Sequence, residues 1–279
     1  MTEIGQQNTL EVIKRTDFGL FLDGDELGEI LLPNRYVPDG CEVGDSVDVF
    51  IYNDSEDRLV ATTQRPRARV GQFAYLKVVD VNQVGAFLDW GLPKDLLVPF
   101  YEQGRDKKML VDRSYVVYVY LDEKTDLIVA SAKLDKHLQL SSPWLKPGQA
   151  VNLLIAGKSD LGYKAIIDNS CWGLVFHGDA LQPLKYGQKI KGFIKNIRGD
   201  GKIDLSLQKT GEGKIDDLAS RILKALEHAD GFLTVTDKSD PKVIFETFGA
   251  SKRAYKMAVG SLLKQKKLSI EKDGIRLSK

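Results

Sequence analysis

The feature that most constrains the fold of this 279-residue chain is a motif that occurs three times along it. In each copy a glycine in a short apolar run is followed soon by an aspartate, and a β-like segment ending in Thr or Ser closes the copy. The glycines and closing hydroxyls, separated by 43, 46 and 44 residues, are Gly19 and Thr62, Gly85 and Ser131, and Gly162 and Ser206. A repeat of nearly constant length predicts a string of similar small modules, so fold and function must be sought in that module.

Each copy has the pattern of five short β-strands joined by turns. In the first copy Val47, Val49 and Ile51 alternate with Asp48 and Phe50, and Pro38-Asp39-Gly40 is one of the turns between apolar runs. Many short strands with few helical signals predict a small closed barrel of Greek-key type. One carboxylate recurs after each glycine, and these residues are interpreted as turn residues at strand ends: Asp23, Asp89 and Asp168.

Two proline-containing stretches mark the junctions between copies. Residues 65–71, RPRARVG, are basic and lack apolar periodicity, which is typical of a linker. Residues 141–148, SSPWLKPG, form the second junction, where Trp144 is expected to pin the linker against a neighbouring module. The predicted domains are three barrels and a fourth domain, at residues 1–65, 66–140, 141–210 and 211–279.

In the fourth domain the hydrophobic period changes to the 3.6 residues of a helix. The apolar stripe of residues 214–229 consists of Ile215, Leu218, Ile222, Leu223, Leu226 and Ala229. Pro241 suits the first turn of a second helix that Gly249 ends, and Ser251 is a candidate N-cap for a third. The expected buried face of the third helix is Ala254, Met257, Ala258 and Leu262. A hairpin turn at Lys272-Asp273-Gly274 completes the order of a winged helix.

The net charge of +1 conceals a strong asymmetry along the chain. Residues 1–64 hold four Lys or Arg and fourteen Asp or Glu, a balance of −10, whereas residues 65–141, 142–211 and 212–279 carry +2, +5 and +4. An acidic module repels phosphates, so nucleic-acid binding is expected in the last three segments. The first barrel is expected to make protein contacts or to regulate, and the alternative is that its carboxylates only keep it in solution.

Composition and motifs argue against several other classes of protein. No apolar run approaches the roughly 18 residues of a membrane span, and the N-terminal residues have no secretory pattern, so no membrane partner is expected. The two cysteines, Cys41 and Cys171, fall in different repeats, which favours a reduced, cytoplasmic setting. His137, His177 and His228 lie in separate modules, and no phosphate loop, nucleophile elbow or zinc-protease motif is present. We therefore expect no enzyme activity, no catalytic residue, no metal site and no cofactor.

Several segments resemble a known module. Residues 18–23, FGLFLD, resemble the Phe-Gly-x-Phe-Val signature of the S1-type RNA-binding domain, and residues 200–207, DGKIDLSL, resemble its closing strand. Three such domains followed by a winged helix resemble the conserved virulence factor B family of bacterial RNA-binding proteins, also called YitL-like, over essentially the whole chain. This resemblance implies a mainly β fold, with tandem five-stranded OB-fold barrels followed by an α+β winged-helix domain.

A second S1 segment, which usually reads Gly-Leu-(Leu/Val)-His-x-Ser, has a degenerate match in every copy. Residues 28–33 and 95–99 resemble it, and residues 173–177, GLVFH, match it with a histidine. By this alignment His177 fills the family's histidine position, which Pro33 and Pro99 occupy in the other two copies. The resemblance therefore implies three unequal modules.

The resemblance also implies where single-stranded RNA binds. In this fold, aromatic side chains on the second and third strands stack on bases while nearby Lys and Arg contact phosphates. Val84 and Leu161 replace the first aromatic in the second and third copies, and Trp90 beside Lys94 is interpreted as a surface pair. The candidate RNA-binding residues are Phe18, Phe21, Phe87, Trp90, Lys94, Lys158, Tyr163, Lys164, Trp172, His177, Lys195 and Arg198. The alternatives are core packing for the phenylalanines and a solvated lysine-rich face for the third barrel. For Tyr118 and Tyr120, core or inter-domain packing is favoured.

The winged helix adds seven basic residues on and around its third helix and wing. They are Lys252, Arg253, Lys256, Lys264, Lys266, Lys267 and Arg276. A recognition helix places its exposed face in a major groove or against a phosphate backbone, and contact with RNA is favoured here over sequence-specific reading of DNA. The sequence therefore predicts a non-catalytic protein that binds single-stranded RNA and affects gene expression. The alternatives are a DNA-binding transcription regulator and a protein-interaction scaffold.

Overall fold

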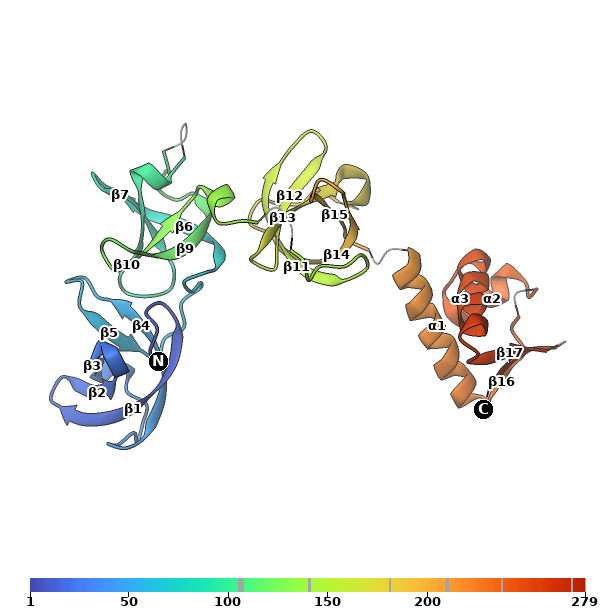
Figure 1. Ribbon diagram of the computed structural model, residues 1–279, viewed down its shortest axis with the longest axis horizontal. Coiled ribbons are helices and arrows are strands. Elements are labelled where there is room, and N and C mark those ends of the chain that lie inside the picture. Colours follow the sequence, from blue (N-terminus) through green and yellow to red (C-terminus); the bar gives the residue numbers. More distant parts are fainter. Residues whose placement is uncertain are drawn as a thin grey trace.

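In the computed structural model, three closed five-stranded barrels follow one another along the chain and a small helical domain with a hairpin ends it (Figure 1). The structure describes residues 1–104, 108–139, 142–180, 182–208, 211–236, 238–271 and 273–278, with the backbone alone for residues 211–217. The predicted mainly β fold of tandem barrels is confirmed. Within the described ranges, no helix combines the length and the apolar character that crossing a membrane requires.

The three barrels share one strand order, in which the first strand lies between the second and fourth and the third lies beside the fifth. The first barrel consists of β1 (Gln7–Thr16), β2 (Gly19–Asp23), β3 (Glu29–Pro33), β4 (Ser46–Asn53) and β5 (Leu59–Thr62). The second consists of β6 (Phe73–Val81), β7 (Gly85–Asp89), β8 (Leu96–Pro99), β9 (Ser114–Asp122) and β10 (Leu127–Ser131). The third consists of β11 (Ala150–Lys158), β12 (Gly162–Ile167), β13 (Cys171–Phe176), β14 (Lys189–Ile197) and β15 (Ile203–Ser206).

The repeated glycine is required because two strands approach each other too closely for a side chain. It stands opposite the last residue of the third strand in every barrel. A Cβ atom at Gly162 would lie 2.1 Å from the carbonyl oxygen of Val175, and the corresponding distances at the other two glycines are 2.1 and 2.3 Å. Backbone atoms of a paired strand cannot move aside, so the glycine belongs to the architecture of the barrel.

The closing hydroxyls lie at the ends of the fifth strands, where each accepts a hydrogen bond from a backbone N–H just after the strand. Thr62, Ser131 and Ser206 are buried, and each Oγ accepts a hydrogen bond from the N–H two residues further on, at 3.0, 3.0 and 3.1 Å. The carboxylates of Asp23 and Asp89 accept in the same way at the ends of β2 and β7, which confirms their interpretation as turn residues. The Asp168 carboxylate instead accepts from Asn152.

The Gly162→Ala substitution is expected to destabilise the third barrel by about 1–3 kcal/mol, the usual cost of overpacking. Chemical denaturation followed by circular dichroism measures the free energy of unfolding. Gly178→Ala is the matched control, because a Cβ atom at Gly178 would meet nothing within 4 Å. Equal stability of the two variants would show that the strand pairing tolerates a side chain at the glycine.

The C-terminal domain has the predicted order of a winged helix. It contains α1 (Gly211–His228), β16 (Phe232–Leu233), α2 (Pro241–Phe248), α3 (Lys252–Lys264), β17 (Leu268–Ile270) and β18 (Ile275–Leu277). Gly249 ends α2 in the left-handed conformation, and the Ser251 hydroxyl caps α3 by accepting from the Ala254 N–H. The predicted hairpin forms between β17 and β18, although Lys272 in its turn lies outside the described residues.

The predicted buried face of the third helix was wrong at one position. Met257 is 50% exposed, whereas the neighbouring Tyr255 is fully buried and donates its hydroxyl to the Val235 carbonyl at 2.7 Å. The buried stripe of α3 is Tyr255, Ala258, Val259 and Leu262. This i, i+3, i+4, i+7 spacing selects the core face, and Met257 falls outside it. The side chain of Ile215, predicted to face the core from α1, lies outside the described residues.

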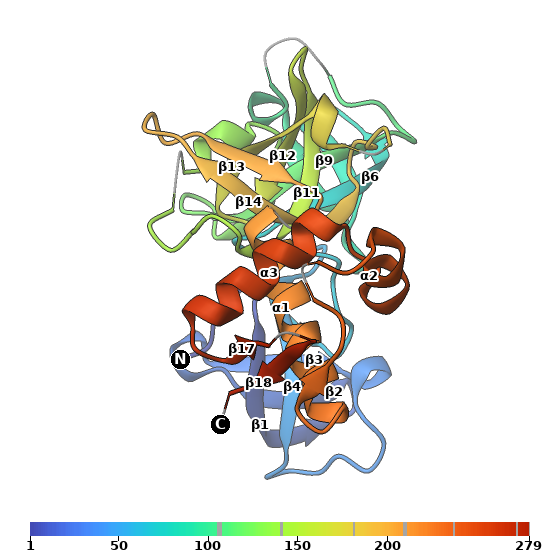
Figure 2. The same ribbon diagram turned by 90° about the vertical axis from the view of Figure 1, so that its right-hand side faces the viewer.

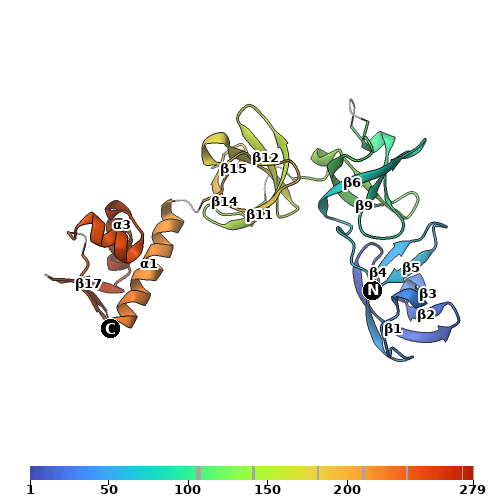
Figure 3. The same ribbon diagram turned by 180° about the vertical axis from the view of Figure 1, so that it is seen from behind.

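The barrels are packed against one another. Phe50, Tyr52 and Val60 of the first barrel belong to the same hydrophobic cluster as the core of the second. Phe73 and Val116 of the second barrel form another cluster with Leu154 and Ile166 of the third. The views from the end and from behind show the winged-helix domain beyond the third barrel, with α3 on the side of α1 that faces away from the barrels (Figures 2 and 3).

Candidate nucleic-acid interface

Every barrel presents the same outer face where its second strand begins. We call this face the platform, and define it as the residue before the repeated glycine, the residue two positions after it, and that residue's partner on the third strand. The three platforms are Phe18, Phe21 and Leu31; Val84, Phe87 and Leu97; and Leu161, Lys164 and Leu174. The residues before the glycines are 78%, 56% and 64% exposed, so apolar side chains stand in solvent at the same position three times.

A cation lies over an aromatic ring at or beside each platform. Lys14 Nζ lies 5.5 Å from the ring centre of Phe21, and Lys108 Nζ lies 5.9 Å from that of Phe100. In the third barrel the guanidinium carbon of Arg198 lies 5.6 Å from the ring centre of Phe176. Exposed rings beside cations can stack on bases and contact phosphates together. Phe100 and Phe176 were not among the residues predicted from the sequence, although the strand register opposite the glycine would have located them.

The predicted alignment of the histidine position was wrong by one residue. Gly162 pairs with Phe176, just as the glycines of the other barrels pair with Pro33 and Pro99, so Phe176 is the counterpart of the prolines. His177 instead begins a 3-10 helix, as Asn34 and Phe100 do. The N–H of each of these three residues donates to the carbonyl of the residue before the glycine. His177 is exposed, so it remains a candidate contact.

Tyr163 does not lie on the platform of the third barrel. It is 7% exposed and belongs to the barrel core, with its ring edge-on to His177 at 5.2 Å. Because side chains alternate between the two faces of a strand, the residue directly after Gly162 points inward and Lys164 points outward. The third platform therefore carries a cation where the other two carry phenylalanine.

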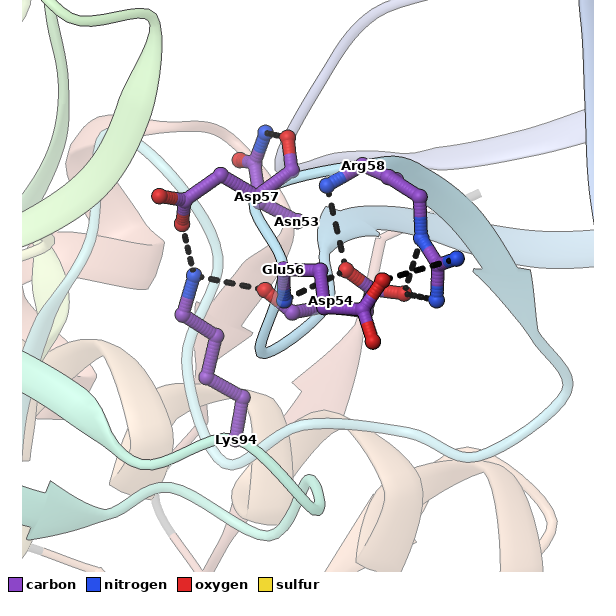
Figure 4. Close-up of polar contacts among 6 residues, drawn as sticks. All are labelled: Asn53, Asp54, Glu56, Asp57, Arg58 and Lys94. Atoms are coloured by element: carbon purple, nitrogen blue, oxygen red, sulfur yellow. Dashed lines mark hydrogen bonds and ion pairs between the residues drawn. The ribbon is translucent and has the colours of Figure 1, made fainter.

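Trp90 and Lys94 do not form a surface pair. Trp90 is 3% exposed, its ring meets Phe50 of the first barrel edge-on at 5.8 Å, and its indole N–H donates to the Lys94 carbonyl at 2.6 Å. Lys94 Nζ donates to the Asp54 carbonyl at 2.8 Å and to the Asp57 carboxylate at 2.6 Å. Figure 4 shows this lysine reaching into the β4–β5 turn of the first barrel. Both residues join the first two barrels, a long-range contact that local sequence does not reveal.

Trp172 lies at the junction of the second and third barrels. Its indole N–H donates to the Asp135 carboxylate at 2.7 Å, and its ring lies 4.3 Å below Lys164 Nζ. Tyr118 packs on the same inter-barrel cluster, as expected from the prediction of core or inter-domain packing, and its ring stacks on His137 at 4.1 Å. The pinning role predicted for Trp144 was wrong, since this side chain is 78% exposed.

The basic residues of the third barrel divide into paired and unpaired groups. Lys195 forms an ion pair with Asp179 at 2.8 Å, and Arg198 forms one with Asp204 at 2.8 Å. The Asp204 carboxylate raises the pKa of Arg198 further, so this side chain stays charged. Lys158 and Lys164 are exposed and make no ion pair with any described residue. Among the basic residues of this barrel predicted to contact RNA, Lys158 and Lys164 are therefore the strongest candidates for phosphate contact.

The seven basic residues of the winged helix divide in the same way. Lys252 Nζ donates to the carbonyls of Lys238 and Ser239, and Arg276 forms an ion pair with Glu271 at 2.6 Å. These two side chains support the domain itself. The exposed remainder, without an ion pair to any residue in the described ranges, is Arg253, Lys256, Lys264, Lys266 and Lys267. They lie on α3 or directly after it.

The protein is modular, with three OB-type barrels that carry exposed platforms and a winged helix whose third helix is basic. Both classes of domain bind nucleic acids in other proteins. Residues 4–64 and 70–132 match the S1 domain family, and residues 220–277 match the CvfB-like winged helix domain. The chain belongs to the family that includes YitL of Bacillus subtilis (strain 168) and conserved virulence factor B of Staphylococcus aureus, which confirms the resemblance seen in the sequence.

The relatives are similar over most of their length. YitL is 31% identical over 278 residues, which cover 95% of this chain and 90% of YitL. Conserved virulence factor B of S. aureus (strain USA300) is 27% identical, over 86% of this chain and 82% of its own. A crystal structure of a multidomain protein with nucleic acid binding domains from Streptococcus pneumoniae is 24% identical and covers 98% of both chains, with a TM-score of 0.40.

Proposed function

We propose that this protein is a non-catalytic RNA-binding protein that takes single-stranded RNA on its second and third barrels and on α3, and thereby affects gene expression. The observation that carries the proposal is an exposed apolar residue on each platform with a cation over an aromatic ring at or beside it, repeated in every barrel. Aromatic faces stack on bases of any sequence, while the cations follow the phosphates. In this proposal the domains are those predicted from the sequence, residues 1–65, 66–140, 141–210 and 211–279, and RNA binding is assigned to the last three.

The charge series supports a division of labour among the barrels. The first platform carries two phenylalanines, yet it stands on a segment with a balance of −10, whereas the segments that follow carry +2, +5 and +4. Repulsion of phosphates by the acidic barrel opposes what its rings would contribute. We assign strand binding to the second and third barrels and to the winged helix, and protein contact to the first barrel.

The Phe87→Ala/Phe100→Ala double substitution is expected to weaken binding of a single-stranded RNA oligonucleotide by roughly 5- to 150-fold, the equivalent of one stacked base at about 1–3 kcal/mol. Fluorescence anisotropy with labelled RNA measures the dissociation constant. Phe18→Ala/Phe21→Ala removes the same kind of side chains from the acidic barrel and is the matched control. A larger loss in the control than in the test variant would reverse the division of labour.

The alternative of a DNA-binding regulator rests on the exposed cations of α3, Arg253 and Lys256 among them. If the winged helix dominates, duplex DNA at equal concentration should displace the bound RNA. The proposed function predicts instead that single-stranded RNA competes better than duplex DNA of the same length. A competition assay with the intact chain separates the two.

A further inference from the structure

A groove with a cavity volume of about 570 Å³ lies between the second and third barrels, which stand side by side in Figure 1. We call it the junction groove. One wall comes from the segment that leads into β6, including Arg67 and Gln72, and the other comes from β11, β12 and β14 of the third barrel. A volume of this size is typical of small-molecule sites. The groove is separate from the platforms, none of whose residues line it.

The floor of the junction groove is apolar. Leu154 on β11 pairs with Ile166 on β12 and with Lys189 on β14, so one row of outward-facing positions crosses three strands. Leu154 and Ile166 are 7% and 1% exposed although they face out of their own barrel, because Phe73 of the second barrel covers them. The floor is therefore closed by contacts between the two barrels, and a ligand in the groove meets mainly the polar and charged side chains of its walls.

One wall of the junction groove carries unpaired positive charge. Lys189 and Lys191 are two residues apart on β14 and therefore share its outer face. Both are exposed, and neither makes an ion pair with a described residue. Arg67 on the opposite wall is held by Asp89 at 2.6 Å, and the Asp168 carboxylate accepts two hydrogen bonds from Asn152 at 2.9 Å. The groove is thus lined by three cations, of which Arg67 is paired with Asp89, and by the Asp168 carboxylate, so Lys189 and Lys191 are its cations without an ion pair to a described residue.

Two amide side chains that line the groove have spare donors. The Gln72 carbonyl oxygen accepts from the Arg69 N–H at 3.1 Å, and the Asn169 carbonyl oxygen accepts from the Phe73 N–H at 3.0 Å. Both side chains are thus oriented by the backbone, while their NH₂ groups have no partner among the described residues. Fixed amides at the edge of an apolar floor can donate to the ring atoms of a base.

We propose that the junction groove binds a nucleotide, with the base beside Gln72 and Asn169 and the phosphate at Lys189 and Lys191. The amides of Gln72 and Asn169 would donate to the edge of the base. Both walls would contact the ligand, so its binding stabilises the arrangement of the second and third barrels. The nucleotide has two sources, a free mononucleotide or one residue of an RNA strand. In the second case only, the inference rests on the proposed function.

The first arm of the test is a calorimetric titration of the intact protein with adenosine and uridine 5′-monophosphate. Binding that Lys189→Ser/Lys191→Ser weakens at least tenfold supports a site for free nucleotides. Lys146→Ser/Lys185→Ser, which removes two exposed lysines of the third barrel that do not line the groove, is the matched control and should leave this affinity unchanged. Equal weakening by both variants, which would mean general attraction by lysines, overturns a specific site.

The second arm uses a short RNA that carries 4-thiouridine, cross-linked by ultraviolet light to the intact protein. Cross-links to residues 67–73 or 189–191 that the groove variant removes support a strand residue as the occupant. No mononucleotide binding together with no cross-link in these segments overturns the inference, while RNA affinity itself still supports the proposed function. Mononucleotide binding without any RNA affinity would sink the proposed function and leave the groove site standing.

Discussion

Trp90→Ala is expected to lower the free energy of unfolding of the first two barrels by about 3–5 kcal/mol, the usual cost of truncating a buried tryptophan. The side chain is 3% exposed and fills the space between the two barrels, where it meets Phe50. Its removal leaves a cavity in a cluster to which both barrels contribute, so both should lose stability together. Urea denaturation followed by circular dichroism, with limited proteolysis to report each barrel, measures the effect.

Trp144→Ala is the matched control for this prediction. Trp144 is 78% exposed, so its truncation should change the free energy of unfolding by less than about 0.5 kcal/mol. If Trp90→Ala left stability unchanged and reduced RNA affinity, Trp90 would be a stacking residue, as its sequence context suggested, and the shared core would be disproved. The same shared core makes deletion of residues 1–64 an unsuitable test of the first barrel, because it would expose Trp90.

Lys158→Glu/Lys164→Glu is expected to weaken single-stranded RNA binding at least about a hundredfold, because each charge-assisted contact is worth about 1.5–3 kcal/mol. Both lysines are exposed and free of ion pairs with described residues, whereas Lys195 and Arg198 are paired within the barrel. Anisotropy with labelled RNA at low salt measures the change. Lys195→Glu is the control, since its charge is already opposed by Asp179 and it should cost less affinity.

A loss of binding free energy from Lys195→Glu that is half the loss from Lys158→Glu/Lys164→Glu, in proportion to the charge that each variant changes, would mean that the total charge of the barrel decides affinity. Both variants remain comparable in fold if their circular dichroism spectra and unfolding midpoints match those of the unmodified protein. This comparison therefore distinguishes a defined contact from diffuse attraction.

The fold could be predicted from the sequence because its determinants are local. The repeated glycine marks a place where a Cβ atom would collide with the facing strand, and the closing hydroxyls cap the next backbone donors. The helix signals of the last domain are equally local, as the Ser251 cap and the Gly249 ending show. Such local features require the same residue types at the same spacing in every copy, and they do not depend on contacts with other domains.

The candidate site could be predicted only in part, because exposure depends on contacts between barrels. The exposed Phe18 follows from the signature, but nothing near Trp90 in the sequence reveals that Phe50 covers it. Tyr163 was misplaced by one residue, and in a strand a shift of one residue exchanges the inner and outer faces. Pairing by carboxylates, as at Lys195, is likewise a three-dimensional property.

The salt dependence of RNA affinity tests the central claim most directly, since bound phosphates release counterions when cations replace them. Titration of the intact protein with a short single-stranded RNA and with duplex DNA, at 50 and 200 mM salt, gives the slope for each ligand. If about five cations of the third barrel and α3 each neutralise a phosphate, RNA affinity falls about a hundredfold over this range, and Lys158→Glu/Lys164→Glu reduces the slope by about 1.4. An RNA affinity that barely changes with salt, or tighter binding of duplex DNA, would contradict single-strand binding by these residues.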